Sequence, residues 1–411
     1  MAIAATGAVS MSDLRTEFVG GSSAISFSDL YRGGSNIRAN AANNSSTNLA
    51  ASVPTSGTIN YTNFRSTAKG FRKTYTATAT NQDASSVFGD DYGVDYPKEI
   101  VINSGVELGA TSTSQEALQI DSGLSGTMTI TNNGTLTGAG GSAGGGAGGD
   151  AFEANVACTL INNGTIRAGG GGGGNGGSGG TGGTGGQGSS TSSSWGSWSS
   201  YQGSTSSGNR KYVYRYGGGS WHNAAWDAVG VSHVSFRAYS YPATYSSGTV
   251  QVQTHSSPQT FQQGHDGNAP YYWFRARMRQ LTTTTHYHSG GSGGSGSSGG
   301  SGGRGQGYNH GNQNGSSGSG GSGGSSGGTN AGSGGTGGTG GTGGNGGTYG
   351  NSGGGGASGA TGNSGGNGNY TNGSGGSGGS SGSGGGAAGK YIRGLSNVTF
   401  TNNGTVQGGT A

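Results

Sequence analysis

Gly173–Gln187 reads GGNGGSGGTGGTGGQ, and Gly334–Thr348 reads GGTGGTGGTGGNGGT. Both stretches keep a register of three, and glycine makes up 103 of the 411 residues. A period of three is typical of an extended helix of the polyproline II type, which has three residues per turn. Two of its three side-chain rows would be bare, so that backbone N–H and C=O groups of neighbouring helices could approach and bond. The pattern therefore predicts stacked polyglycine helices.

A flexible linker is the alternative, because glycine- and serine-rich segments are usually disordered. Glycine loses more backbone entropy on ordering than any other residue, so only several helices bonded to one another would be stable. The segments available for such a stack are roughly 168–190, 289–307, 315–348, 352–368 and 373–389, with a short one at 138–149. Between Ser289 and Gly389 the only charged residue is Arg304, whereas disordered chains usually stay soluble through charge. We therefore favour ordered packing.

The overall composition limits the classes of protein that the chain can represent. Only 27% of the residues are hydrophobic and 8% are charged, so no large apolar core extends over the whole length. Cys158 is the single cysteine, which excludes an internal disulfide. A net charge of +4 is too mild to indicate a nucleic-acid partner. The sequence has no long apolar run and no evident secretory signal, so we expect no membrane insertion.

Three related segments stand in the first part of the chain. They read AVSMSDL at Ala8–Leu14, AISFSDL at Ala24–Leu30 and TINYTNF at Thr58–Phe64. In the first two an aspartate follows a serine by three residues, the spacing of a capping box, so each predicts a short helix. Helices this short are marginal alone, and we expect their apolar anchors to bury against another surface. These anchors are Met11, Leu14, Phe27, Leu30, Tyr61 and Phe64. The alternative is that they pack on one another.

Residues 73–167 are rich in β-strand signals. Lys73–Thr80 alternates as KTYTATAT, and later stretches end in Asn-Gly turns, TNNGT at Thr131–Thr135 and INNGT at Ile161–Thr165. Such a turn between apolar positions is typical of a hairpin, because both residues tolerate positive φ. It also suits the corner of a β-solenoid, and the sequence leaves both arrangements open.

The same turn returns near the end of the chain, where TFTNNGTV at Thr399–Val406 matches TLINNGTI at Thr159–Ile166. A linker between two domains has no need of matching ends. The match therefore favours one β framework that is interrupted by the glycine region.

A segment of different composition, Trp195–His288, lies inside the glycine region. It contains all five tryptophans and six of the seven histidines, and its alternating runs predict one small β sandwich or barrel. Most of its aromatic residues are expected in a core. Trp195, Trp198 and Tyr201 lie among serines, so we expect these three to be partly exposed.

Together these patterns predict a mainly β fold with polyglycine II-type helices and very little α-helix. The boundaries follow the changes in composition along the chain. The expected divisions are an N-terminal docking region at 1–72, a β-rich segment at 73–167, polyglycine helices at 168–194, an aromatic-rich β insert at 195–288, further polyglycine helices at 289–389 and a closing β element at 390–411.

The opening of the chain resembles that of tail-associated virion proteins of bacteriophages, marine phages especially. The residues that carry the resemblance are GAVSMSDLRTEF at Gly7–Phe18 and AISFSDLYRGG at Ala24–Gly34. The triplet runs resemble the glycine-rich adhesins at the long-fibre tips of T-even-type phages. In that family, stacked polyglycine helices form a sandwich and the loops between them contact the host surface. Residues 195–288 match nothing in the adhesin pattern, and residues 1–72 differ from that family's attachment domain.

The resemblance implies a receptor-binding virion protein of the phage tail, with other tail proteins and a host glycan or outer-membrane protein as partners. Carried over, it places host contacts on the segments that interrupt the glycine runs, namely at Tyr308, His310, Asn312, Asn314, Tyr349, Asn351, Asn369 and Tyr370. Tyrosine rings stack on sugars or protein loops, and asparagine both donates and accepts hydrogen bonds. The aromatic insert is the rival surface, through Trp195, Trp198 and Tyr201.

Enzymatic and metal chemistry receive little support from the sequence. Glycoside hydrolysis needs a carboxylate pair, and the insert offers only Asp227 and Asp266, so we expect no enzyme, no catalytic residue and no cofactor. The acidic residues at 83–121 and 150–153 leave a hydrolase as an alternative. His286 and His288 share one face of a predicted strand, a spacing that a metal could use, but without further ligands nearby they are weak candidates. In a homotrimer three such pairs would surround one axis, and the oligomeric state stays open.

Two other functions remain as alternatives. The chain would serve as a purely structural fibre, collar or decoration protein if the glycine region were only a rigid spacer. Ice binding would suit the threonine rows of Gly334–Thr348, but the phage-like N-terminus does not favour it.

Overall fold

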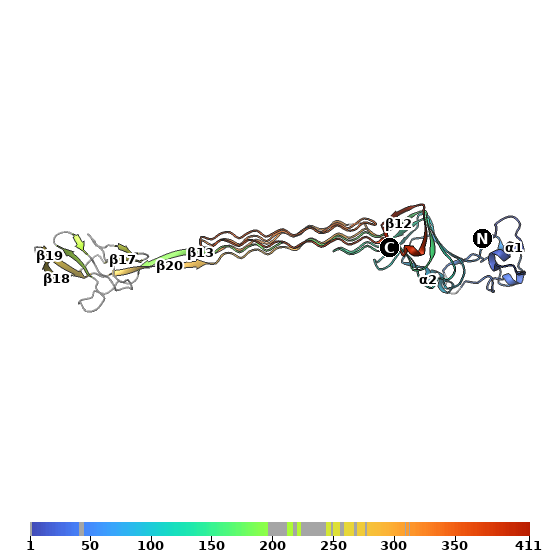
Figure 1. The fold of residues 1–411 in the computed structure, drawn as a ribbon, viewed down its shortest axis with the longest axis horizontal. Coiled ribbons are helices and arrows are strands. Elements are labelled where there is room, and N and C mark those ends of the chain that lie inside the picture. The colour runs from blue at the N-terminus through green and yellow to red at the C-terminus, as the bar shows by residue number, and fades with distance from the viewer. Residues whose placement is uncertain are drawn as a thin grey trace.

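The computed structural model of the chain describes residues 2–40, 45–195, 281–308, 310, 311 and 313–411, and between 196 and 280 only the backbone of the strands named below. The described parts form a long rod (Figure 1). Short helices lie at one end, stacked parallel sheets follow, and a bundle of extended glycine segments continues the rod. The fold is mainly β with very little helix. Within these residues no helix has the length and apolar character of a membrane span.

The N-terminal unit packs its short helices on one another. They are α1 (Met11–Leu14), the π-helical turn η1 (Arg15–Val19), and the 3-10 helices η2 (Phe27–Leu30) and η3 (Tyr61–Phe64). Both expected capping boxes are present; at the first, the Ser10 N–H donates to Asp13 Oδ2 at 2.7 Å. Leu14, Leu30 and Phe64 are fully buried in one cluster. Of the two arrangements expected for these apolar side chains, the structure shows the one in which they pack on one another.

Three sheets stack their strands in successive rungs beside this unit. The first runs, in spatial order, β1 (Thr47–Asn48), β2 (Phe71–Tyr75), β5 (Lys98–Ile102), β8 (Met128–Asn132), β11 (Cys158–Asn162) and β22 (Val398–Asn402). The second runs β24 (Gly409–Thr410), β21 (Lys390–Arg393), β10 (Phe152–Ala154), β7 (Leu118–Ile120) and β4 (Gln82–Asp83). The third runs β23 (Thr405–Gln407), β12 (Thr165–Arg167), β9 (Thr135–Thr137), β6 (Glu107–Gly109) and β3 (Ala79–Thr80). Within these three sheets the pairing is parallel, except between β1 and β2.

This arrangement is a β-solenoid and not a set of hairpins. β8 and β9 flank the turn at Asn133–Gly134, yet β8 pairs with β5 and β11, while β9 pairs with β6 and β12. Gly134 does not have the positive φ that a hairpin turn would need. Glycine is required there for another reason, because a Cβ would lie 2.2 Å from the carbonyl oxygen of Val106 on the preceding rung.

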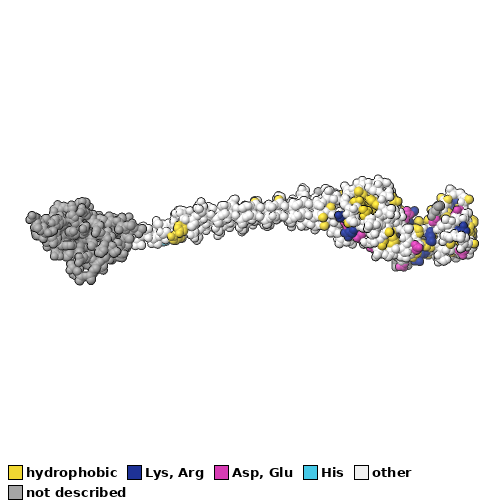
Figure 2. Space-filling model, in the orientation of Figure 1, with side chains coloured by type: hydrophobic (Ala, Val, Ile, Leu, Met, Phe, Trp, Pro, Cys, Tyr) yellow, Lys and Arg dark blue, Asp and Glu magenta, His cyan; other side chains and the backbone are white. Residues whose placement is uncertain are grey.

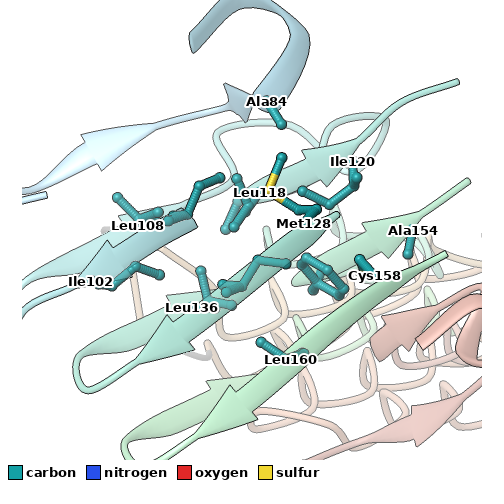
Figure 3. Close-up of a cluster of buried hydrophobic side chains, with 14 of the residues drawn as sticks. Ala84, Ile102, Leu108, Leu118, Ile120, Met128, Leu136, Ala154, Cys158 and Leu160 are labelled. Carbon is teal, nitrogen blue, oxygen red and sulfur yellow. The ribbon is translucent and has the colours of Figure 1, made fainter. Parts of the chain in front are cut away.

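Inward side chains of the rungs build the apolar core of the solenoid (Figure 3). Ile102, Leu136 and Leu160 come from successive turns of the chain and are fully buried. Helix α2 (Ala84–Phe88) packs against β4 and β7 and buries Phe88 in the same cluster. The apolar positions of the strands therefore face one continuous interior.

Stacked asparagines tie the last rung to the earlier ones. The Asn132 amide donates to Asn162 Oδ1 at 2.8 Å, and the Asn162 amide donates to Asn402 Oδ1 at 2.7 Å. The first two are 30 residues apart, whereas Asn162 and Asn402 are 240 apart. β22 therefore continues the framework that β11 leaves, as the matching turns predict.

The strands between 188 and 288 form two antiparallel four-stranded sheets. One has the order β13 (Gly188–Trp195), β20 (Met278–His288), β17 (Val250–Thr254) and β16 (Thr244–Ser247). The other has the order β15 (Ser220–His222), β14 (Tyr212–Tyr216), β19 (Ala269–Arg275) and β18 (Gln259–Asp266). β13 and β20 leave the bundle as a paired ribbon (Figure 1).

Six extended glycine segments form the bundle. In chain order, glycine segments 1 to 6 are 168–187, 289–307, 313–328, 332–347, 352–368 and 373–389. They lie side by side and are joined by backbone hydrogen bonds that recur at every third residue (Figure 1). From Gly173, Gly176 and Gly182 of segment 1, for example, the N–H groups donate to carbonyl oxygens of segment 2, each at 2.8 Å. The bundle is therefore held together chiefly by its backbone.

Segment 1 lies at the centre and bonds to four other segments, and near the solenoid it also bonds to residues 141–149. Its N–H groups donate to segments 2 and 5, and its carbonyl oxygens accept from segments 4 and 6. The Gly174 N–H, for example, donates to Gly354 of segment 5 at 2.9 Å, while the Gly174 oxygen accepts from Gly344 of segment 4 at 2.8 Å.

Serine hydroxyls satisfy a third row of N–H groups on segment 1. The Thr181 N–H donates to Ser377 Oγ at 2.7 Å. The serines of segment 6 that accept in this way recur every third residue: Ser374, Ser377, Ser380 and Ser383. Segments 2 and 3 repeat the arrangement, with the Ser295 N–H donating to Ser322 Oγ at 2.7 Å.

The close approach of the segments explains which rows are glycine. A Cβ on Gly179 of segment 1 would lie 2.0 Å from the carbonyl oxygen of Gly338, far inside van der Waals contact. At Gly378, on the outward row of segment 6, nothing lies within 4 Å of that position. Exposed rows therefore accept side chains, as Ala357 and Ala360 do on segment 5.

Gly179→Ala should destabilise the bundle by about 2–3 kcal/mol, because the new methyl group forces two hydrogen-bonded backbones apart. The matched control Gly378→Ala should stay within about 0.5 kcal/mol of the parent chain. The free energy of unfolding in guanidinium chloride measures both. Equal effects of the two substitutions would contradict the packing described here.

Replacing Ser377 and Ser380 together by alanine should cost about 2 kcal/mol, since two N–H groups of segment 1 lose their acceptors. Ser358 and Ser364 are exposed on segment 5, and their double alanine variant is the control. Amide hydrogen exchange of residues 178 and 181 gives a local readout. Unchanged protection there would rule out a structural role for the serine row.

Asp121→Asn should stabilise the solenoid at pH 7.5 by about 1 kcal/mol after allowance for solvent screening. The hydrogen bond with Asp83 and partial burial raise the pKa of Asp121 to about 6. The folded chain therefore binds this proton more tightly than the unfolded chain, and the stability it contributes is lost as the pH rises from about 4 through 6. Thermal unfolding between pH 5 and pH 8 tests the prediction, with exposed Asp90→Asn as the control.

Candidate functional site

The turns of the bundle fall into two groups at opposite ends. Those after segments 2 and 4 lie against the solenoid, whereas those after segments 3 and 5 lie at the remote end, where β13 and β20 leave the bundle. The expected host-contact residues are thereby separated. Tyr308, His310, Asn314, Tyr349 and Asn351 lie at the solenoid end, and Asn369 and Tyr370 lie at the remote end.

Tyr308 and His310 are half-buried in the junction between bundle and solenoid. The ring of Tyr308 fills the space beside Gly109 of β6, where a Cβ would lie 2.0 Å from a ring carbon. The imidazole of His310 packs beside Gly140, and burial, together with nearby Arg304, lowers its pKa. Both side chains thus contact the protein itself.

Tyr349 is half-buried in the same junction. Its ring lies over the Arg167 guanidinium of β12, whose central carbon is 4.1 Å from the ring centroid, and its hydroxyl donates to the Gly307 oxygen at 3.3 Å. Burial raises the pKa of Tyr349. Asn351 is exposed, and its amide donates to Thr348 Oγ1 at 2.8 Å within the turn. The aromatic candidates of this end join two parts of the fold.

Asn369 fixes the turn at the remote end. Its Oδ1 accepts from the Ser189 N–H at 2.6 Å, and its Nδ2 donates to the Ser189 oxygen at 2.9 Å. Asn330, from the neighbouring turn, donates to the same oxygen at 3.0 Å. The Tyr370 N–H donates to the Gln187 oxygen at 3.2 Å. The turn is therefore fastened to the start of β13.

An exposed pair of aromatic rings, Tyr287 and Tyr370, lies beside this turn. We call it the tyrosine pair. The ring centroids are 4.7 Å apart with an interplanar angle of 56°, and the side chains are 61% and 54% exposed. A side-chain hydrogen bond with Tyr370 raises the pKa of Tyr287. Among the described residues only Tyr61 is another exposed large hydrophobic side chain.

Tyr287 is the site residue that sequence reasoning missed. It stands between two histidines that were singled out, and strand alternation places it on the opposite face of β20 from them. Nothing in the sequence brings it near Tyr370, because the contact depends on the pairing of β20 with β13 and on the turn after segment 5.

The two weak metal candidates bond instead to serines across the ribbon. His288 Nε2 lies 2.7 Å from Ser190 Oγ, and His286 Nε2 lies 2.7 Å from Ser192 Oγ. No group of three metal-ligating side chains occurs within the described part of the chain. The imidazoles thus support the pairing of β13 with β20.

The remaining receptor candidates are only partly covered by the structure. Trp195 ends β13 opposite Leu281 and is half-buried. Trp198, Tyr201 and Asn312 lie outside the described residues. Asn314 is exposed at the beginning of segment 3.

The six docking candidates differ in accessibility. Leu14, Leu30 and Phe64 are fully buried, and Met11 and Phe27 are partly buried against the same cluster. Tyr61 is 38% exposed, with its ring edge-on to Phe27 at 4.8 Å. A docking surface on this unit would therefore be built around Tyr61, with the buried side chains holding its shape.

Comparison with known proteins gives one match. Residues 70–268 match the family model described as phage tail fibre adhesin Gp38, which covers the solenoid strands β2 to β12, segment 1 and much of the insert. The expectation that the insert lies outside the adhesin pattern is therefore wrong for residues 195–268. No curated protein and no solved structure matches the chain. This similarity, which extends over just under half of the chain, supports a phage tail-fibre adhesin, a protein of the virion tail.

Proposed function

We propose that the protein is a receptor-binding adhesin that docks to the tail through residues 1–72 and presents the remote end of the bundle to the host surface. The observation that supports this most directly is position. The N-terminal unit lies at one end of the rod, whereas the tyrosine pair lies at the remote end of the bundle, where β13 and β20 leave it (Figure 1). An adhesin needs such a separation, because the tail and the host are contacted at the same time.

We infer that the glycine segments are polyglycine II-type helices. In support, the backbone hydrogen bonds from segment 1 to any one neighbouring segment recur at every third residue. This is the pattern expected of a helix with three residues per turn. On this interpretation the chain divides into a docking region at 1–72, a β-rich segment at 73–167, helical bundle parts at 168–194 and 289–389, the insert at 195–288 and a closing element at 390–411.

Stiffness is what the bundle contributes to this function. Hydrogen bonds from segment 1 to four neighbours, repeated along its length, resist bending and shear. Charged side chains gather over the N-terminal unit and the solenoid, while the face of the bundle in view has almost none (Figure 2). The bundle would hold the host-contacting end away from the tail without itself attracting charged surfaces.

The host partner in this proposal is a surface glycan or an outer-membrane protein, and the docking partners are other tail proteins. Tyr61 is the exposed aromatic residue of the docking region. A purely structural spacer is the competing function, and a rigid rod would serve it equally well. Binding to host cells separates the two.

The purified full-length chain should bind cells of a susceptible host saturably and compete with phage adsorption. At about ten times its Kd the protein would occupy about 90% of receptors, so adsorption should fall about tenfold. Fluorescently labelled protein on cells and residual free phage measure the two effects.

A resistant host strain that no longer adsorbs the phage is the control, and labelled protein should not bind it. Absence of saturable binding to the susceptible strain would leave the spacer as the function of the chain.

A further inference from the structure

We propose that the tyrosine pair binds the apolar face of a neutral hexopyranose unit of a host-surface polysaccharide. The inference rests on the proposed adhesin function and names its ligand class. Three features support it: the exposure of the two rings, the hydrogen bonds that hold their backbone, and the absence of Lys, Arg, Asp and Glu from the described residues around them.

The two rings offer accessible aromatic faces in a fixed relation. Each side chain is more than half exposed, although burial of tyrosine is favourable, and the two rings lie against each other at a tilt of 56°, so that together they form one exposed aromatic patch. The axial C–H groups of a pyranose pack well on aromatic faces, while the phenol hydroxyls at the ring edges bond to sugar hydroxyls. The patch therefore offers a sugar ring both apolar ring faces and polar ring edges.

Both tyrosines are anchored to the same short piece of backbone. Tyr287 stands opposite Ser189 in the pairing of β20 with β13, and Asn369, next to Tyr370, makes two hydrogen bonds to Ser189. The Thr371 hydroxyl accepts from the Gln187 N–H at 2.7 Å. Because the aromatic patch exists before a ligand arrives, little conformational entropy is lost on binding.

The surroundings of the pair favour an uncharged ligand. Residues 187–195, 281–303 and 305–389 contain no Asp, Glu, Lys or Arg, and Arg304 lies at the solenoid end of the bundle. Among the residues that the structure describes at this end of the bundle, phosphate or carboxylate groups of an anionic saccharide would find no Lys or Arg, whereas neutral hydroxyls find amides and hydroxyls, including the exposed side chain of Gln187. Charge complementarity therefore selects a neutral sugar over an acidic polysaccharide or a charged protein loop.

The test uses the full-length chain with methyl α-glucopyranoside, methyl α-galactopyranoside, methyl α-mannopyranoside and dextran as probes. Saturation-transfer NMR and titration calorimetry should detect binding of at least one of them. Tyr287→Ala and Tyr370→Ala should each weaken it about tenfold or more, as expected for aromatic residues that dominate a binding site. Tyr370→Phe keeps the ring face and should retain most of the affinity.

Ser358→Ala is the control, since Ser358 is exposed on segment 5, away from the tyrosine pair. It should leave saccharide binding unchanged. The thermal unfolding midpoint of every variant should equal that of the parent chain, because the substituted side chains are exposed.

Cell adsorption of the same variants distinguishes this inference from the function on which it rests. If the parent chain adsorbs to host cells but binds none of the probes, or if adsorption survives both alanine substitutions, the saccharide site is overturned and the adhesin stands. If the probes bind through the tyrosine pair but the chain does not adsorb to cells, the site stands and the adhesin function fails.

Discussion

The close approach of glycine backbones is the constraint on which this structure depends. Segment 1 can bond to four neighbours only because no side chain stands between them, and a single Cβ at Gly179 would fall 2.0 Å from a carbonyl oxygen. Ordering so much glycine is entropically costly. The cost is offset because nearly every inward N–H and C=O group finds a backbone partner in a neighbouring segment. The bundle therefore replaces an apolar core with a core of peptide groups.

The non-glycine rows follow from the same constraint. A central segment needs bare rows toward several neighbours, while an outer segment needs one. This is why segment 5 carries Ala357 and Ala360 where segment 1 carries glycine. The serines of segments 3 and 6 are part of the hydrogen-bond network, since their hydroxyls accept from N–H groups of the adjacent segment. The low-complexity sequence is therefore a pattern in which glycine positions face neighbouring segments, serine positions accept hydrogen bonds, and other residues stand on exposed rows.

The bundle also determines which turn residues are exposed to a partner. The turns at the solenoid end are used for joining, with Tyr349 over Arg167 and Tyr308 beside Gly109. At the remote end Asn369 holds the backbone, and this leaves Tyr370 and Tyr287 exposed. The same residue types, tyrosine and asparagine on glycine turns, therefore have different tasks at the two ends. Their task depends on the neighbour that each turn meets.

Local patterns in the sequence predict the mainly β framework, the capping boxes at Ser10 and Ser26, the return of the framework at Thr399, and the rows of three in the glycine region. These features are local or repetitive, so they can be recognised without knowing what lies nearby. The choice between hairpins and a solenoid needed the folded structure, because an Asn-Gly corner fits both and the difference lies in pairing between rungs 30 residues apart. The folded structure likewise decided that Leu14, Leu30 and Phe64 pack on one another and that Tyr287 meets Tyr370. Contacts between distant segments depend on how the segments stack, and that is fixed by steric fit and hydrogen bonding across the fold, which local sequence patterns do not encode.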